Sequence, residues 1–365
     1  MILMNDFKAE PESLRVAELA AVDRVLRSGW YVLGNEVKAF EAEWAARCGI
    51  AHAIGVGNGM DAIEIGLRSL DIGAGDEVIT TPMTAFATVL AIIRAGATPV
   101  LADIDPATAL LDPQSVERCI TPKTKAVLLV HLYGQISNMD RWLSLCETHG
   151  IALLEDCAQS HLASWNGRVA GSFGRFGAYS FYPTKNLGAI GDAGAIVSND
   201  SKLIQRAGIL RNYGQKVRYY HAELGLNSRL DEIQAALLRV RLGLLDEFTL
   251  RRQQIAKTYF ERIANSKIEL LAQPLQTASH VYHLFAVKCL ERERLAEHLK
   301  SSGVETFVHY PVPVHRQEPC AHLRCDPNGL AATEQHAATC LSIPCHPQMS
   351  DADVATVVGA INAFV

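Results

Sequence analysis

Short apolar runs alternate with amphipathic segments along most of the first 210 residues. Apolar runs bounded by glycine or polar residues predict buried strands, and apolar residues that recur every three or four positions predict helices. The expected strands lie at 53–56, 76–80, 98–102, 125–132, 151–155, 178–182 and 195–198, and the expected helices at 13–28, 36–48, 63–70, 88–95, 113–120, 139–149 and 201–210. This order predicts an α/β fold in which helices flank a mostly parallel mixed sheet on both faces.

The pattern changes in the last third of the chain. A polar loop at 211–221 and a long helix at 231–248 are followed by a strand at 280–288, a helix at 291–301, a strand at 304–309, an extended segment at 310–315 and a closing helix at 351–365. A chain of 365 residues is too long for one ordinary core. We therefore expect a large domain at 1–245, with an N-terminal helical segment, and a smaller α+β domain at 246–365.

Composition narrows the class of protein. Hydrophobic residues make up 49% of the chain and charged residues 20%, and the formal net charge is −5, which is typical of a soluble globular protein. No run of Lys and Arg indicates a nucleic-acid partner. The N-terminal MILMNDFKAEPE lacks the regions of a secretory signal and no apolar run has membrane-spanning length, so we expect a cytoplasmic protein without a membrane partner.

Nine cysteines are spread along the chain, which fits reduced thiols in the cytoplasm. The alternative is a zinc site, for which histidines interleave with Cys320, Cys325, Cys340 and Cys345. Zinc sites usually have C-x2-C-type spacing, whereas four residues separate the members of each pair here. Cys340 also lies in an apolar run, which favours burial, and we therefore expect no metal.

The stretch at 178–189 carries the main chemical signal. A strand runs to Tyr182, Pro183 stops it, and a glycine-rich tail turns the chain sharply. Lys185 is left on that turn, where glycine backbone lets a bulky group approach. Such a lysine can act as a covalent nucleophile on a carbonyl compound, although most lysines are solvated surface residues.

Asp156 and Gln159 lie upstream of this lysine, in EDCAQ at 155–159. Asp156 ends a predicted buried strand, at the edge where open α/β sheets bind ligands. A carboxylate there and a lysine on a later turn suit pyridoxal 5'-phosphate (PLP), which needs an amine for its aldehyde and an anion for its ring nitrogen. Gln159 could donate to the ring hydroxyl, and Asp156 taken alone could instead cap a helix.

A strand, a glycine turn and a helix meet in GVGNGMDA at 55–62. A helix N-terminus with free amides binds phosphate. The third glycine of the G-x-G-x-x-G fingerprint is missing, so the pattern does not indicate a dinucleotide site. The turn of Asn58, Gly59 and Met60 is therefore a candidate phosphate site, with Ser180 as a second donor.

These motifs resemble the DegT/StrS family of PLP-dependent sugar-nucleotide aminotransferases almost from end to end. The resemblance is carried by SGWYVLG at 28–34, GNGMDAI at 57–63, HLYGQ at 131–135, EDCAQ at 155–159, SFYPTKNLGAIGDAG at 180–194, RNYGQ at 211–215, GLNSRLDEIQAALLRV at 225–240 and HYPVPVH at 309–315. It implies the PLP fold type I and a homodimer. It also implies Lys185 as the Schiff-base lysine, Asp156 on the pyridine nitrogen, Gln159 on the ring oxygen, Ser180 and the Asn58–Met60 turn on the phosphate, and Asn227 reaching the phosphate of the neighbouring subunit.

Two positions depart from the family pattern. Met60 stands where the family usually has Ser or Thr, so this turn offers amides and Asn58 instead of a hydroxyl. Ala85 stands where the family commonly has an aromatic residue that stacks on the cofactor ring, and Phe86 follows one position later. A shift by one residue changes the direction of a side chain, so the stacking role of Phe86 stays open.

Basic and aromatic residues interleave in the 211–221 loop. The plain interpretation is a solvated loop, whereas the resemblance favours a loop whose basic residues hold a diphosphate and whose tyrosines hold a base or sugar. The substrate-facing residues that the resemblance implies are Tyr31, Tyr182, Lys216, Arg218, Tyr219, His221, Arg229, His309, Tyr310 and His315.

The resemblance implies transfer of an amino group from an amino acid, glutamate, to a keto-sugar nucleotide. The motifs look most like enzymes that make 3-amino-3,6-dideoxyhexoses on dTDP, for O-antigen or another polysaccharide. The alternatives are amination at C4 of a UDP- or GDP-linked 4-keto sugar, a PLP-binding regulator without turnover, and a fold-type-I enzyme acting on small amino acids. Family dehydratases replace the Schiff-base lysine, so the presence of Lys185 argues against them.

Overall fold

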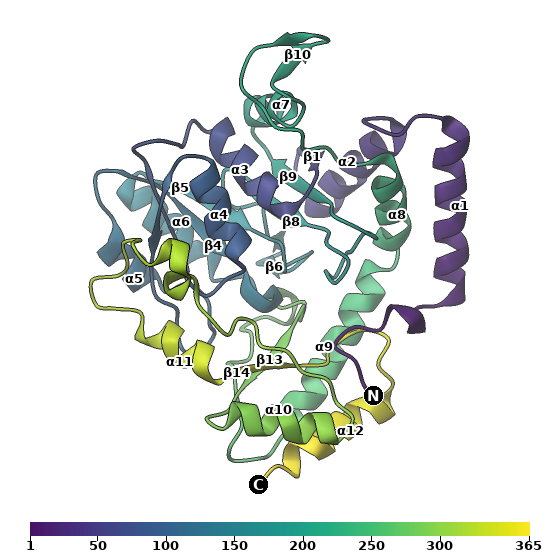
Figure 1. Ribbon diagram of the computed structural model, residues 1–365, viewed down its shortest axis with the longest axis vertical. Helices are drawn as coiled ribbons and strands as arrows, with labels where there is room; N and C mark the ends of the chain where they lie inside the picture. The colour runs from purple at the N-terminus through teal and green to yellow at the C-terminus, as the bar shows by residue number, and fades with distance from the viewer.

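The computed structural model describes all residues from Met1 to Val365 and has the predicted α/β architecture (Figure 1). Its central sheet has seven strands in the order β1-β9-β8-β5-β4-β2-β3. These strands are β1 (His52–Val56), β2 (Glu77–Thr80), β3 (Thr98–Leu101), β4 (Thr124–Val130), β5 (Ala152–Asp156), β8 (Gly177–Ser180) and β9 (Gly194–Ser198). Strand β9 runs antiparallel to β1 and β8, and the other pairs are parallel, so the sheet is mixed but mostly parallel.

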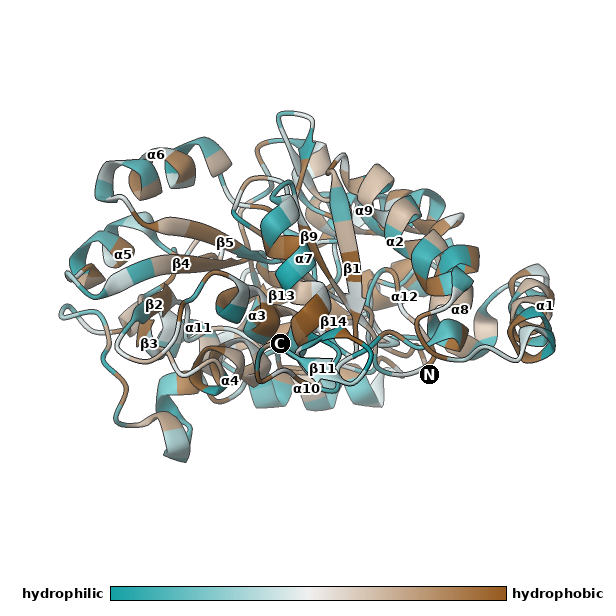
Figure 2. Ribbon diagram, turned by 90° about the horizontal axis from the view of Figure 1, so that it is seen from above, coloured by the Kyte–Doolittle hydropathy of each residue, from teal (hydrophilic) through white to brown (hydrophobic).

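Helices cover both faces of this sheet. One face packs a core of 36 buried residues that draws on α2 (Asn35–Cys48), α5 (Pro113–Cys119), α6 (Met139–His149) and α8 (Glu232–Leu242). The other packs a core of 20 that draws on α3 (Gly59–Ser69), α4 (Phe86–Arg94) and α7 (Ser201–Leu210). Strands β4 and β5 run through the middle of these layers in Figure 2. Because both faces of these strands are covered, their sequences are continuous apolar runs.

Polar caps begin several of these helices at the expected places. A side-chain oxygen accepts first-turn amides at Asn58, Asp112, Asn138, Asp200 and Ser350. Glycines in the left-handed conformation end α2 and α6, at Gly49 and Gly150. These local signals explain why the sequence predicts these helix ends well.

A separate core of 21 buried residues lies in the lower part of Figure 1. Helices α9 (Leu245–Arg262), α10 (Arg292–Ser301) and α12 (Asp351–Asn362) surround a sheet of β12 (Glu269–Leu270), β13 (Phe285–Lys288) and β14 (Cys340–Ile343). Helix α11 (Ala331–Thr339) precedes β14. The N-terminal segment also reaches this region, because Ile2 pairs with Val304. The division into domains near residue 245 stays a prediction.

Four expected elements differ in the structure. The strand expected at 280–288 begins only at Phe285, as β13. The helix expected at 231–248 is two helices, α8 and α9, separated at Gly243 and Leu244. The strand expected at 304–309 is irregular and bridges β14 only at Phe307. Part of the 211–221 loop forms a hairpin of β10 (Gln215–Val217) and β11 (Tyr220–His221). In each case the hydrophobic pattern is compatible with both outcomes, and tertiary contacts decide between them.

Helix α1 (Glu12–Ser28) stands at the right edge of Figure 1. It packs on α8 through a small core of Ala21, Val25 and Ala236. Several apolar side chains on its other faces are exposed, among them Val16 and Leu19. None of the helices is both long enough and apolar enough to cross a lipid bilayer.

Candidate active site

Lys185 lies on a tight loop directly after β8. Its backbone amide donates to the carbonyl of Tyr182 at 2.8 Å, and the amide of Ala189 donates to the carbonyl of Phe181 at 2.8 Å. A Cβ atom at Gly188 would lie 2.3 Å from the carbonyl oxygen of Pro183, so this position requires glycine. The Pro-x-Lys-x-x-Gly spacing therefore folds the chain back on itself and fixes the lysine.

Asp156 ends β5, next to β8, where it pairs in register with Ala178. Its carboxylate is 5% exposed and accepts hydrogen bonds from Thr88 Oγ1 at 2.8 Å and from the amide of Ala158 at 3.1 Å. Burial raises the pKa of Asp156, and these two donors together with Lys185 oppose that rise. Burial is the larger effect, so the pKa of Asp156 stays above its ordinary value, while the two donors and Lys185 stabilise the ionised form.

Burial and Asp156 also shift the pKa of the Lys185 amine. Burial lowers the pKa of Lys185 from 10.5 to about 8, and the negative charge of Asp156 opposes that shift. The two groups are therefore close enough to interact electrostatically. A lysine with this pKa has a substantial neutral fraction near pH 8, which a nucleophilic amine needs.

Gln159 has a fixed orientation. The backbone amide of Tyr133 donates to its Oε1 at 2.6 Å, and its Nε2 donates to Tyr310 Oη at 3.2 Å. Because the oxygen is already engaged, the side chain presents N–H groups to the site. This arrangement fits a donor to the ring oxygen of PLP, as the sequence predicts.

The turn of Asn58, Gly59 and Met60 begins α3. The Asn58 side chain accepts the amide of Asp61 at 2.8 Å, and the first-turn amides of Gly59 and Met60 have no partner within the helix. A Cβ atom at Gly59 would lie 2.6 Å from Cβ of Ser180, so the turn and the end of β8 are in direct contact. The amides and the Ser180 side chain therefore converge on one cradle, which suits a phosphate group.

Ser228 is a residue of this cradle that the sequence analysis did not single out. It is 1% exposed, and its hydroxyl accepts the amide of Gly57 at 3.0 Å. Ser228 follows Asn227, which is exposed and pairs with Asn212 through an isolated bridge. The phosphate turn is thus anchored to the segment that contains Asn227.

Tyr310 and His309 lie beside the same cluster. Tyr310 Oη contacts Gln159, and His309 Nδ1 is 2.9 Å from Ser342 Oγ. Burial and the positive charge of Lys185 lower the pKa of His309 to about 4.

His315 lies apart from this cluster, since its Nε2 pairs with Glu334 on α11 at 3.1 Å. The amide of Tyr182 reaches Ser180 Oγ at 3.3 Å, while the Tyr182 side chain is half exposed.

The predicted substrate residues at 216–221 do not join the Lys185 cluster within one chain. Lys216, Arg218, Tyr219 and His221 lie on the β10–β11 hairpin, which projects at the top of Figure 1. All four are exposed, and His221 bonds only to the carbonyl of Tyr213. Arg229 lies beside the base of the hairpin, where its Nη1 donates to Asn212 Oδ1 at 3.2 Å.

Comparison with known proteins identifies the family to which this site belongs. The model of the DegT/DnrJ/EryC1/StrS aminotransferase family matches residues 12–362. The chain belongs to this family. It is a transaminase with the fold-type-I architecture of the solved aminotransferases, and the family assignment inferred from the sequence is confirmed.

Two relatives and one solved structure are similar to this chain along nearly their whole length. The chain is 44% identical over 359 residues to the dTDP-3-amino-3,4,6-trideoxy-alpha-D-glucose transaminase of Streptomyces venezuelae, covering 98% of this chain and 95% of that one. It is 42% identical over 363 residues to the pleiotropic regulatory protein of Geobacillus stearothermophilus, covering 99% of this chain and 98% of that one. The crystal structure of S. venezuelae DesV in complex with a ketimine intermediate matches with a TM-score of 0.95 at 43% identity, covering 99% of this chain and 97% of that one.

The structure shows the contacts of Met60 and Phe86, near the two positions that depart from the family pattern. Met60 packs partly against the core that holds α3, and its Sδ lies 4.0 Å from Arg94 Nη1. Phe86 is the first residue of α4 and packs partly against a small cluster that includes Val89 and Val314. A stacking role for Phe86 on the cofactor ring stays a prediction.

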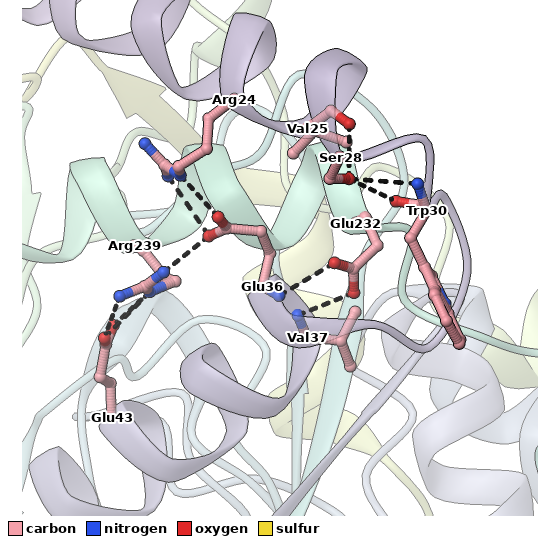
Figure 3. Close-up of polar contacts among 9 residues, drawn as sticks. All are labelled: Arg24, Val25, Ser28, Trp30, Glu36, Val37, Glu43, Glu232 and Arg239. Carbon is pink, nitrogen blue, oxygen red and sulfur yellow. Dashed lines mark hydrogen bonds and ion pairs between the residues drawn. The ribbon is translucent and has the colours of Figure 1, made fainter.

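The SGWYVLG loop that carries part of the family resemblance is fixed by a residue far away in sequence. The carboxylate of Glu232, in the first turn of α8, accepts the amides of Gly34, Glu36 and Val37 at 2.7, 2.9 and 3.0 Å. Figure 3 shows the bonds from Glu36 and Val37. The carboxylate thereby caps the N-terminus of α2. Trp30 and Tyr31 are nevertheless 63% and 51% exposed, so the loop presents aromatic side chains on a fixed backbone.

The alternative zinc site is not assembled. Cys320 packs in a small cluster with Val314, and Cys325 lies at the edge of that cluster. Cys340 and Cys345 pack in two other, separate hydrophobic cores. The ligand-type side chains that do gather are His131, Glu155 and Cys157, all fully buried. The Glu155 carboxylate already accepts amides from Gly171, Phe173 and Gly174, so it serves the backbone.

Proposed function

We propose that this chain transfers an amino group from L-glutamate to the keto carbon of a dTDP-3-keto-6-deoxyhexose, in the biosynthesis of a deoxyamino sugar. The observation that carries the proposal is the Lys185–Asp156 pair in a chain that is 44% identical to a dTDP-amino-sugar transaminase. The nine free cysteines, none of them in a disulfide, fit a cytoplasmic enzyme. O-antigen or another polysaccharide is the destination we infer for the product.

The residues of the site fit PLP as the cofactor. Lys185 would hold its aldehyde carbon, Asp156 its ring nitrogen and Gln159 its ring oxygen, while the Asn58–Met60 turn and Ser180 would hold its phosphate. When bound, PLP supplies a carbon that exchanges amino groups and a ring that withdraws electrons. The fit rests on the oriented amide of Gln159 and on the cradle at Gly59, where Ser180 leaves no room for a Cβ atom.

Each protein group has a separate task. The Lys185 amine, once free, would take the proton from the donor's α-carbon and pass it to the reacting carbon of the cofactor. In the second half-reaction it would take a proton from that carbon and donate one to the former keto carbon of the sugar, because its pKa of about 8 allows both protonation states. Asp156, as a carboxylate, would stabilise positive charge on the ring nitrogen of the cofactor. Thr88 holds Asp156 in place through its hydroxyl. Tyr310 and His309 border the space that the sugar would enter.

We further infer a homodimer with a shared site. The exposed hairpin residues Lys216, Arg218, Tyr219 and His221 make no contact with Lys185 of their own chain, and Asn227, Tyr31 and Trp30 are exposed as well. A second copy would cover these groups and receive them at its nucleotide end. A C2 dimer allows both sites to be completed in the same way.

The test is a panel of keto-sugar nucleotides offered to the purified holoenzyme with L-glutamate. We expect the C3 amino product from the dTDP-linked 3-keto sugar and none from the Lys185→Ala variant. Amination of a UDP- or GDP-linked 4-keto sugar in preference would replace this substrate with the C4 alternative. Formation of 2-oxoglutarate in step with the aminated sugar identifies the donor.

A PLP-binding regulator without turnover is the second candidate, because a relative at 42% identity is named a pleiotropic regulatory protein. The two functions separate in a simple half-reaction. Incubation of the holoenzyme with glutamate alone converts the yellow cofactor to a colourless form in a transaminase. An unchanged spectrum with every common amino acid would favour the regulator.

A further inference from the structure

Arg252 on α9 is a buried cation without a counter-charge. It is 5% exposed, and its Nη1 donates to the backbone carbonyls of Tyr282, His283 and Cys345 at 3.2, 3.4 and 2.5 Å. Its Nε is enclosed and has no acceptor. Burial lowers the pKa of Arg252 to about 10, and no carboxylate opposes the shift. The group is still cationic at neutral pH, and an uncompensated buried charge is costly.

A cavity of about 30 Å³ lies against this guanidinium. Its walls are the N-terminal segment from Asn5 to Phe7 with Glu10, the loop segment from Pro183 to Asn186, which includes Lys185, and side chains that include Arg241 and Gln348. A single water needs roughly 10–15 Å³ of such volume. The cavity therefore holds about two waters or one small ion, and it is too small for an amino acid or a sugar nucleotide.

The two carboxylates in the wall already have partners. Glu10 receives Nη1 and Nη2 of Arg241 at 2.9 and 2.8 Å. Asp6 Oδ1 accepts the amides of Lys8 and Ala9 at 3.0 and 3.2 Å. Asn5, Thr184 and Gln348 add neutral amide and hydroxyl groups that can donate. Arg252 pairs with neither of these carboxylates and donates only to backbone carbonyls, so its guanidinium has no counter-charge in contact with it.

We propose that this cavity binds one small monovalent anion of the halide class, held by Arg252 and by the neutral donors around it. The anion would lie behind the loop that carries Lys185 and would join that loop to α9 and to the N-terminal segment. Lys185 itself lines this cavity, so the anion would lie next to the residue that we propose to carry the cofactor. The small volume of the cavity excludes the sugar nucleotide and the amino donor, and the anion site stands whether or not the proposed substrate is correct.

The experiment is thermal unfolding of the holoenzyme in sodium bromide or chloride, compared with sodium gluconate at equal ionic strength. We expect a saturable rise of about 2–4 °C in Tm with either halide. Arg252→Met should abolish the rise. Arg251→Met is the matched control, because Arg251 is the neighbouring arginine but pairs with Asp351 at the surface, and this variant should keep the rise. Crystals soaked in bromide should show anomalous density beside Arg252.

Three results would overturn the proposal. The first is an equal response to halide in Arg252→Met and the wild type. The second is a rise with glutamate but none with halide, which would contradict the size argument. The third is bromide-soaked wild-type crystals without anomalous density in the cavity, and this crystallographic result decides the question even if Arg252→Met does not fold.

Discussion

At the residue scale, two opposing effects set the reactivity of Lys185. Burial disfavours its ammonium form, whereas the negative charge of Asp156 favours it, and the resulting pKa is about 8. The neutral amine is thus present at a lower pH than in a solvated lysine. The two residues depend on each other, because Lys185 also opposes the rise in the pKa of Asp156.

Asp156→Asn should lower the pKa of Lys185 further, since it removes the charge that raises it. The measurement is competitive acylation of cofactor-free protein across pH, with mass spectrometry of the Lys185 peptide. We expect an inflection near pH 8 in the wild type and at a lower pH in the variant. Asp351→Asn, at an exposed ion pair, is the control and should not shift it. An inflection that stays in place or rises would contradict the pairing.

Thr88→Val should impair the enzyme through Asp156, because it deletes a 2.8 Å hydrogen bond to the carboxylate. A hydrogen bond to a charged group is worth about 1.5–3 kcal/mol, so we expect a fall in kcat of roughly 10- to 100-fold with a small change in KM. Thr88 lowers the pKa of Asp156, so its loss should move the acid limb of the kcat profile to higher pH. Thr88→Ser should restore both kcat and the position of the acid limb. An acid limb that does not move in Thr88→Val would show that Thr88 only packs against its neighbours.

The sequence singles out Lys185, Asp156 and Gln159 because each stands in a short, specific motif, and their roles stay predictions. It does not predict Thr88 or Ser228, although both bond directly to the site. Thr88 is 68 positions from Asp156, and Ser228 is 171 from Gly57. Contacts across such distances follow from the order of the strands and leave no local signal that a single sequence can show.

At the element scale, α2 begins where a side chain from another helix caps it. Glu232→Gln should destabilise the protein by about 1–3 kcal/mol, because the carboxylate accepts three backbone amides of α2 and its preceding turn. Urea unfolding measures the loss, and faster hydrogen exchange at 30–37 locates it. Glu43→Gln removes a carboxylate from a more exposed pair with Arg239 and should cost under about 1 kcal/mol. Equal effects of the two variants would contradict the capping role.

Element boundaries are predictable where they are capped locally and unpredictable where they are not. Asn138 and Gly150 bracket α6 as the sequence indicates. The break between α8 and α9 at Gly243 has no such signal, because apolar positions continue across it and one glycine is tolerated in a helix. The hairpin at 215–221 forms from residues that read equally well as an open loop.

At the scale of the whole molecule, we propose that a second chain completes the candidate site. The hairpin and the Trp30–Tyr31 loop are exposed, whereas the Lys185 cluster is enclosed by β5, β8 and the 309–310 segment. The sequence predicts a site shared between two chains only through the family resemblance, since no hydrophobic pattern marks the surface that a partner would contact. In a shared site, the activity of each chain would depend on residues of the other chain.

Mixing two inactive variants tests this sharing. Lys185→Ala lacks the amine, and Asn227→Asp would place a carboxylate against the phosphate of the partner subunit. In a shared site, one site of each mixed dimer is intact, so unfolding and refolding the variants together should restore roughly a quarter of wild-type activity. Each variant refolded alone is the control. A mixture as inactive as its components would show that Asn227 serves its own chain.

The central claim is that Lys185 carries the cofactor, and one chemical trap tests it directly. Borohydride reduction of the purified holoenzyme, followed by peptide mapping, should place a single phosphopyridoxyl group on the Lys185 side chain, with none on the Lys185→Ala variant. An adduct on another lysine, or reduction that leaves residue 185 unmodified, would contradict the account.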